Sequence, residues 1–201
     1  MLPWLLAAVT LAAVAFTTPA VGRHLFEVFA DMPQPAWDRW LSPIESRLLR
    51  WIGDTGRSAD TAIGYLIPLV ISNTLFGGVA LLLLLWQPAI LNPLGFSGLR
   101  WDLAVHTTIS FLTNTDQQHL IPEQSLGNLA QLGALQFLMF VSAASGLAVG
   151  FAVIRGFAGK PLGNFYRDLL RALTRMLIPG SLLLALFLLV SGVPMTLAPP
   201  L

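Results

Sequence analysis

Seven consecutive polar residues, positions 113–119, interrupt an otherwise apolar part of the chain. A cation that crosses a bilayer must exchange its hydration shell for protein oxygens, usually main-chain carbonyls. A strand with hydroxyl and amide side chains suits this task, and one carboxylate beside it adds negative charge. We therefore identify a candidate cation filter with two glutamines at its mouth, formed by Thr113, Asn114, Thr115, Asp116, Gln117 and Gln118.

The segment before the polar run, Trp101–Leu112, is predominantly apolar and predicts a short helix. Twelve residues of helix span about 18 Å, roughly half of a bilayer core. Its carboxyl end would face the polar run with partial negative charge, which favours a cation. A long apolar segment resumes near Gly127. The pattern is typical of a re-entrant loop, and an ordinary extracellular loop between two spans explains these residues equally well.

Enzymatic readings have little support. Asp102, His106 and Ser110 repeat at helical spacing and could form a hydrolytic site, but such a site needs defined hydrogen bonds among all three residues. The sequence has no glycine-rich phosphate loop, and it has no cysteine for thiolate or disulfide chemistry. We expect no catalytic site in this chain.

The composition indicates an integral membrane protein. Apolar residues make up 55% and charged residues 10% of the chain, and the mean hydropathy is +0.73; soluble domains carry about 25% charged residues. We predict four membrane-spanning helices and one half-length helix, an all-α fold. The predicted spans are Leu2–Val21, Ile63–Trp86, Leu126–Arg155 and Met176–Val193.

The basic residues predict the orientation. Five lie within residues 23–57, one is Arg100, and five lie within residues 155–175. Lys and Arg are enriched in cytoplasmic loops, so both groups of five are expected in the cytoplasm, and the N-terminus and Arg100 outside. The first helix lacks the basic start of a signal peptide and is expected to be retained. A net charge of +1 argues against nucleic acid as a partner.

Three further segments have coarser predictions. Residues 23–60 mix charges with tryptophans and prolines, which suits either short amphipathic helices at the membrane interface or a solvated loop. Residues 155–175 are expected to form a cytoplasmic loop, with a kink at Pro179-Gly180 in the helix that follows. Ser142, Gly146 and Gly150 repeat every four residues, a small-residue stripe that predicts close helix packing.

Several motifs occur together in one order. They are Leu91-Asn92-Pro93, Trp101-Asp102-Leu103-Ala104, Thr107, Ser110-Phe111, Thr113-Asn114-Thr115, Gln118, Glu123, Ser142-Ala143-Ala144-Ser145-Gly146, Val153-Ile154-Arg155, Leu162-Gly163-Asn164 and Asp168-Leu169-Leu170-Arg171. Over about residues 64–192 the chain resembles the potassium-transporting ATPase A chain (KdpA) family.

The resemblance implies a fold of the potassium channel and transporter superfamily, with four repeats of helix, half-helix, filter strand and helix. Residues 1–22 would be an extra N-terminal helix, 23–60 a cytoplasmic or interfacial segment, 61–155 the first repeat, and 156–201 a loop and the opening helix of a truncated second repeat. Potassium would be the transported ion, held at Thr113, Asn114 and Thr115, and no other cofactor is implied.

The resemblance also implies partners and a location. ATP hydrolysis would belong to a P-type ATPase subunit, assisted by small accessory subunits, in the multi-pass setting of a bacterial cell membrane. One repeat supplies one quarter of a filter ring, so further repeats or copies are expected to complete it. The chain departs from the family motif at His106 and Asp116 (both Asn in the family), Gln117 (Trp), Ile121-Pro122 (Ser-Gly) and Leu138-Met139 (Gln-Asn). The alternative function is a membrane interaction or assembly protein that kept the fold without conduction.

Overall fold

The computed structural model describes residues 2–30, 35–54, 56–87 and 90–193. Regular structure in this part is helical, apart from one isolated bridge between Ala59 and Gly163. Four of its helices are long and apolar enough to cross a membrane, which confirms the predicted number. The chain forms two compact units, residues 1–47 and 48–201, and each is described by itself.

The first unit contains one long apolar helix, α1 (Leu2–Phe29). The helix continues eight residues beyond the predicted end at Val21, because no glycine or proline interrupts residues 23–29. The hydroxyls of Thr17 and Thr18 donate to main-chain carbonyls one turn back, at 2.9 and 2.7 Å, so neither side chain is left unsatisfied in an apolar setting. Helix α2 (Pro35–Trp51) follows, which favours the helical interpretation of residues 23–60 over a loop.

The second unit is built around α3 (Ala62–Trp86), which matches the predicted second span to within one residue. Thr61 caps its start, because the threonine hydroxyl accepts a hydrogen bond from the Gly64 amide at 3.1 Å. The helix ends at Gln87, whose backbone is left-handed with φ 40°.

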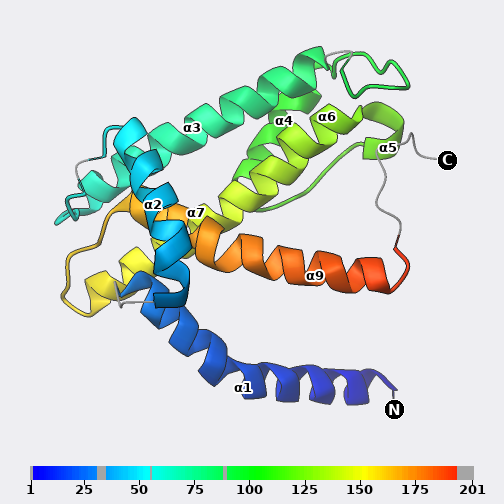
Figure 1. Cartoon of the computed structure of the whole chain (residues 1–201). Helices are drawn as coiled ribbons and strands as arrows, with labels where there is room; N and C mark the ends of the chain where they lie inside the picture. Colours follow the sequence, from blue (N-terminus) through cyan, green and yellow to red (C-terminus); the bar gives the residue numbers. More distant parts are fainter. Residues whose placement is uncertain (1, 31–34, 55, 88–89, 194–201) are drawn as a thin grey trace. The chain divides into compact units, whose positions relative to one another are not determined.

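Helix α4 (Trp101–Leu112) has the bounds predicted for the half-length helix. It packs between α3 and the helices that follow it, and Ala80, Leu84, Ala104, Phe111, Ala134 and Leu138 form the centre of this core. Gly77 of α3 permits the close approach, since a Cβ there would lie 3.1 Å from Leu112. Figure 1 shows that the chain leaves the far end of α4 in extended form and returns to α5 (Pro122–Ser125), at the end where α4 began. Residues 101–121 are called the α4 hairpin below.

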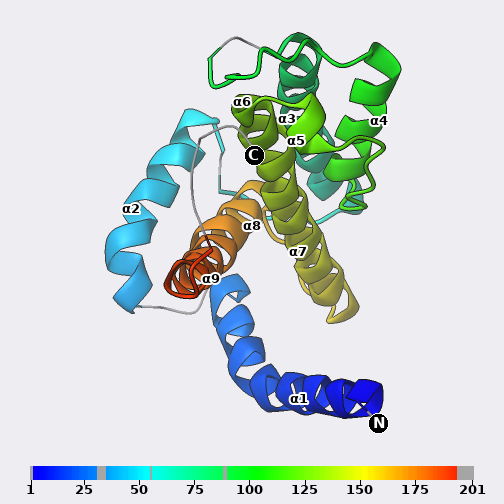
Figure 2. The same ribbon diagram turned by 90° about the vertical axis from the view of Figure 1, so that its right-hand side faces the viewer.

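The third long helix contains α6 (Asn128–Ala130), a π-helical segment (Gln131–Gln136) and α7 (Phe137–Phe157). Figures 1 and 2 show these three pieces as one continuous rod. Of the predicted small-residue stripe, Ser142 is buried, whereas a Cβ added at Gly146 or Gly150 meets no atom within 4 Å among the described residues. Ser142 shares the buried face of α7 with Ser145, Ala148 and Ala152.

The fourth long helix begins earlier than predicted. Helix α8 (Phe165–Arg171), a π-helical segment (Ala172–Leu177) and α9 (Ile178–Val190) follow one another without a break, so only residues 158–164 form the loop expected to reach Arg175. The irregular turn lies before Pro179 rather than at it. A proline ring clashes with the carbonyl four residues earlier, which here belongs to Arg175 inside the π-helical segment.

The predicted orientation can be tested by cysteine labelling, because the chain has no cysteine of its own. Lys160 and Glu123 are both exposed in the structure. We expect an impermeant maleimide to label a Glu123→Cys variant in intact cells, and a Lys160→Cys variant only after permeabilisation. The reverse pattern would overturn the orientation.

Candidate functional site: the α4 hairpin

The tip of the α4 hairpin is a helix C-cap of the Schellman type. The Asn114 amide donates to the carbonyl of Phe111 at 3.3 Å, and the Thr115 amide to that of Ser110 at 3.0 Å. Asn114 takes the left-handed conformation that this cap requires, with φ 58°, and asparagine tolerates it better than most residues. The first residues of the polar run therefore form the C-cap of α4.

Asp116 repeats the left-handed conformation two residues later, with φ 53°. Its amide donates to Ser110 at 3.2 Å, so Ser110 accepts from both Thr115 and Asp116. Within the described residues, no hydrogen bond reaches the main-chain carbonyls of Thr113, Asn114 or Thr115. Residues 113–119 are all exposed. The tip thus presents three carbonyl oxygens free to bind a ligand.

The side chains at the tip position the backbone. The Thr113 hydroxyl donates to the Ile109 carbonyl at 2.9 Å and lies 3.2 Å from the Thr115 hydroxyl. The Asn114 side-chain oxygen accepts from the Ser142 hydroxyl of α7 at 3.3 Å. The main-chain carbonyls are therefore better placed than these side chains to serve an ion.

Gln87 holds the base of the α4 hairpin. Its side-chain amide is buried, and its nitrogen donates to the carbonyls of Ser97 at 2.7 Å and Ser125 at 2.8 Å. Its oxygen accepts from the Gly127 amide at 2.9 Å. One side chain therefore joins the segment that enters the hairpin to the segment that leaves it. In the sequence Gln87 indicates only the end of a span, because its partners are distant along the chain.

The residues considered for hydrolysis do not form a triad. Asp102 pairs with Arg100 at 2.6 Å, and this hydrogen bond holds the pKa of Asp102 below its usual range. His106 contacts His119. The Ser110 hydroxyl is buried and has no hydrogen-bond partner in the described structure. No chain of hydrogen bonds joins the three.

The two glutamines predicted at the mouth, Gln117 and Gln118, lie in different surroundings. Asp116 and Gln118 line a cavity of about 350 Å³ together with Glu123, Gln131 and Gln136. Gln117 is exposed and is not among the residues that line this cavity. The cavity thus adjoins the tip on the side of the π-helical segment of the third long helix.

The other end of the second unit contains a buried ion pair that composition alone does not reveal. The Arg155 guanidinium donates to both carboxylate oxygens of Asp168, at 2.6 and 3.0 Å, and to the Leu162 carbonyl at 2.8 Å. The Tyr65 hydroxyl donates to the same carboxylate at 3.0 Å. This cluster joins α3, α7 and α8. In the sequence, Arg155 contributes to the predicted orientation and to the motif Val153-Ile154-Arg155, and neither indicates its pairing with Asp168.

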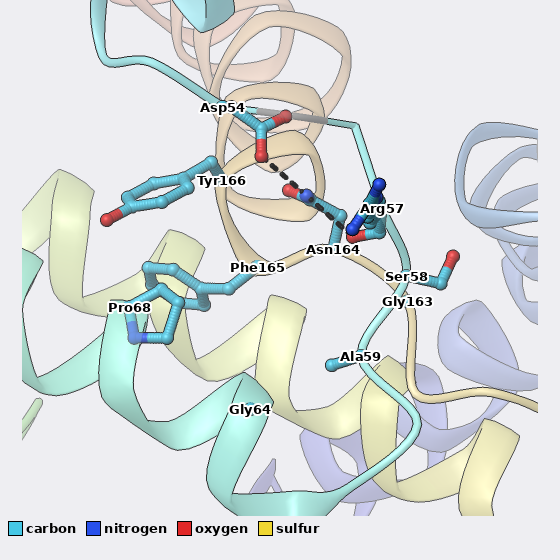
Figure 3. Close-up of a pocket in the computed structure, with 10 residues that line it drawn as sticks. All are labelled: Asp54, Arg57, Ser58, Ala59, Gly64, Pro68, Gly163, Asn164, Phe165 and Tyr166. Carbon is cyan, nitrogen blue, oxygen red and sulfur yellow. Dashed lines mark hydrogen bonds between the residues drawn. The ribbon is translucent and has the colours of Figure 1, made fainter.

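A pocket of about 250 Å³ lies beside this cluster, and Figure 3 shows its lining. The Asn164 amide nitrogen donates to Asp54 at 2.8 Å and to the Arg57 carbonyl at 3.1 Å. Its oxygen caps α8 by accepting from the Arg167 amide at 3.0 Å. These contacts hold the segment before α3 against the start of α8.

The comparisons decide the family. A model of the family described as Potassium-transporting ATPase A subunit matches residues 8–201. The chain belongs to this family. It is 45% identical over 195 residues to a potassium-transporting ATPase potassium-binding subunit of Synechocystis sp., covering 96% of the chain and 35% of the relative.

Two further relatives of the family bear the same name. The Gloeobacter violaceus protein is 46% identical over 190 residues, which cover 94% of the chain and 33% of that protein. The Staphylococcus haemolyticus protein is 40% identical over 180 residues, which cover 88% of the chain and 32% of that protein. The chain spans about a third of the length of these curated relatives.

Proposed function

We propose that this chain supplies one pore hairpin to the potassium path of an ATP-driven potassium pump. The observation that carries the proposal is the set of free carbonyls at Thr113, Asn114 and Thr115, at the carboxyl end of a half-length helix. Carbonyl oxygens replace the hydration shell of potassium, and a helix carboxyl end favours a cation. Asp116 adds a full negative charge beside them.

The α4 hairpin is proposed to be re-entrant. Its helix is too short to cross a bilayer, and its return segment is not helical. Non-helical backbone at membrane depth is tolerated only where protein or water surrounds it. Other repeats or copies are therefore proposed to cover the exposed tip and close the filter ring, and a P-type ATPase subunit with small accessory subunits to drive transport.

The test places this chain within a complete subunit. The matching segment of the Gloeobacter violaceus subunit is replaced by this chain, and potassium uptake is measured in cells that depend on the pump. We expect Asn114→Pro to lower uptake at least about tenfold, because proline fixes φ near −65° and removes the amide hydrogen bond to Phe111.

Three matched variants complete the test. Asn114→Gly keeps the positive φ and the amide, so most uptake should persist. Thr113→Val removes only a hydroxyl that caps α4 and should also be tolerated. Asp116→Asn should change the apparent potassium affinity while transport continues. Normal uptake with Asn114→Pro in a correctly assembled pump would reject the filter and favour a non-conducting assembly role.

A further inference from the structure

Two of the three histidines of this chain meet on the α4 hairpin, although 12 residues separate them. His106 lies on α4 and His119 on the return segment, and their ring centres are 4.6 Å apart with planes at 82°. Both rings are exposed. They border a cavity of about 460 Å³ together with Arg100, Asp102 and Leu103.

We infer that His106 and His119 form a binding site for a divalent transition-metal ion of the zinc class. Imidazole nitrogens bind zinc at about 2.1 Å, and two of them at a tetrahedral angle place their ring centres about 5 Å apart. The observed separation of 4.6 Å is close to this value, so rotation of the rings suffices to bring a nitrogen of each onto one ion.

Asp102 is the neighbouring carboxylate. It lies one helical turn before His106 and lines the same cavity. Arg100 holds both oxygens of this carboxylate, with two hydrogen bonds of 2.6 Å, so Asp102 contributes negative charge near the site and is not one of the ligands. As it stands, the described structure holds no group of three such ligands in metal-binding arrangement, so water completes the coordination of a two-histidine site.

The position of the site gives metal binding a structural effect. One ligand lies on each arm of the α4 hairpin, and residues 113–116 lie between the two arms' ligands along the chain. A bound ion would join the arms and restrict their separation. A metal ion at this position would restrict the hairpin whether or not the tip conducts potassium.

The experiment measures zinc binding to the purified chain in detergent, prepared without a polyhistidine tag. We use isothermal titration calorimetry with zinc chloride and follow thermal unfolding in parallel. We expect one zinc ion per chain and an increase in the melting temperature. His106→Asn, which introduces the residue of the family motif, and His119→Asn should each weaken zinc binding at least about tenfold.

His24→Asn is the matched control, because it removes the third histidine and leaves the hairpin intact. Nickel should compete with zinc, whereas magnesium should not, because it prefers oxygen ligands. Circular dichroism verifies that each variant keeps its helices, and if one hairpin variant fails to fold the other decides. Unchanged zinc affinity in a folded hairpin variant would overturn the site, as would an equal loss in His24→Asn.

Discussion

Replacing Asp168 with alanine should lower the free energy of unfolding of the second unit by about 3–5 kcal/mol, the usual cost of removing one partner from a buried ion pair. The Asp168 side chain is 3% exposed and that of Arg155 17%. The substitution removes the carboxylate that accepts two hydrogen bonds from the largely buried guanidinium and one from the Tyr65 hydroxyl. Reversible unfolding in mixed micelles, followed by circular dichroism, measures the loss.

Asp102→Ala is the matched control for this prediction. The Arg100–Asp102 pair has the same 2.6 Å separation as the buried pair, but its side chains are 79% and 43% exposed. Water replaces the lost partner at such a site, so stability should hardly change. An equally small loss in both variants would contradict the structural importance of the buried pair.

Replacing Gln87 with methionine should cost about 2–4 kcal/mol, since the buried Gly127 amide and the part-buried carbonyls of Ser97 and Ser125 lose their partner, and each unsatisfied buried group costs about 1–3 kcal/mol. Methionine keeps the length of the side chain but cannot reproduce its hydrogen bonds to Ser97, Ser125 and Gly127. Hydrogen exchange should rise on both sides of the α4 hairpin, near residues 97 and 127.

Gln117→Met is the control for Gln87→Met, because it makes the same chemical change at an exposed position. Its stability and hydrogen exchange should match those of the parent chain. If Gln87→Met also left the exchange of residues 97–127 unchanged, the hydrogen bonds of the Gln87 side chain would have no role in holding the hairpin.

The α4 hairpin was largely predictable because the sequence changes sharply from apolar to polar residues where the helix ends. The apolar run ends at Leu112 and the polar run begins at Thr113, and the observed helix ends there too. The predicted end of α1 and the predicted start of the fourth long helix were wrong because each was placed close to a charged residue. Arg23 suggested an early end for α1, and the basic residues between Arg155 and Arg175 suggested a loop, although α1 continues past the first and α8 contains Arg167 and Arg171.

The contacts that position the hairpin could not be predicted in the same way. Gln87 contacts Gly127 across 40 positions, and Tyr65 contacts Asp168 across 103; no local pattern encodes such pairs. The start of α8 does have a local signal, because Asn164 precedes its apolar residues and is a typical N-cap. Gly146 and Gly150 show the opposite case, because these two members of the stripe are exposed and have no packing neighbour among the described residues, whereas Ser142 is buried.

The α4 hairpin is held by more hydrogen bonds at its base than at its tip, so we expect the base to be the more rigid end. Three hydrogen bonds of 2.7–2.9 Å fix its base through Gln87. At the tip, one hydrogen bond of 3.3 Å, between Ser142 and Asn114, joins the polar run to α7. The thermal displacement of the backbone atoms should therefore increase from the base of the hairpin to its tip. Local opening should begin in residues 117–119, whose exposed backbone makes no hydrogen bond within the described structure.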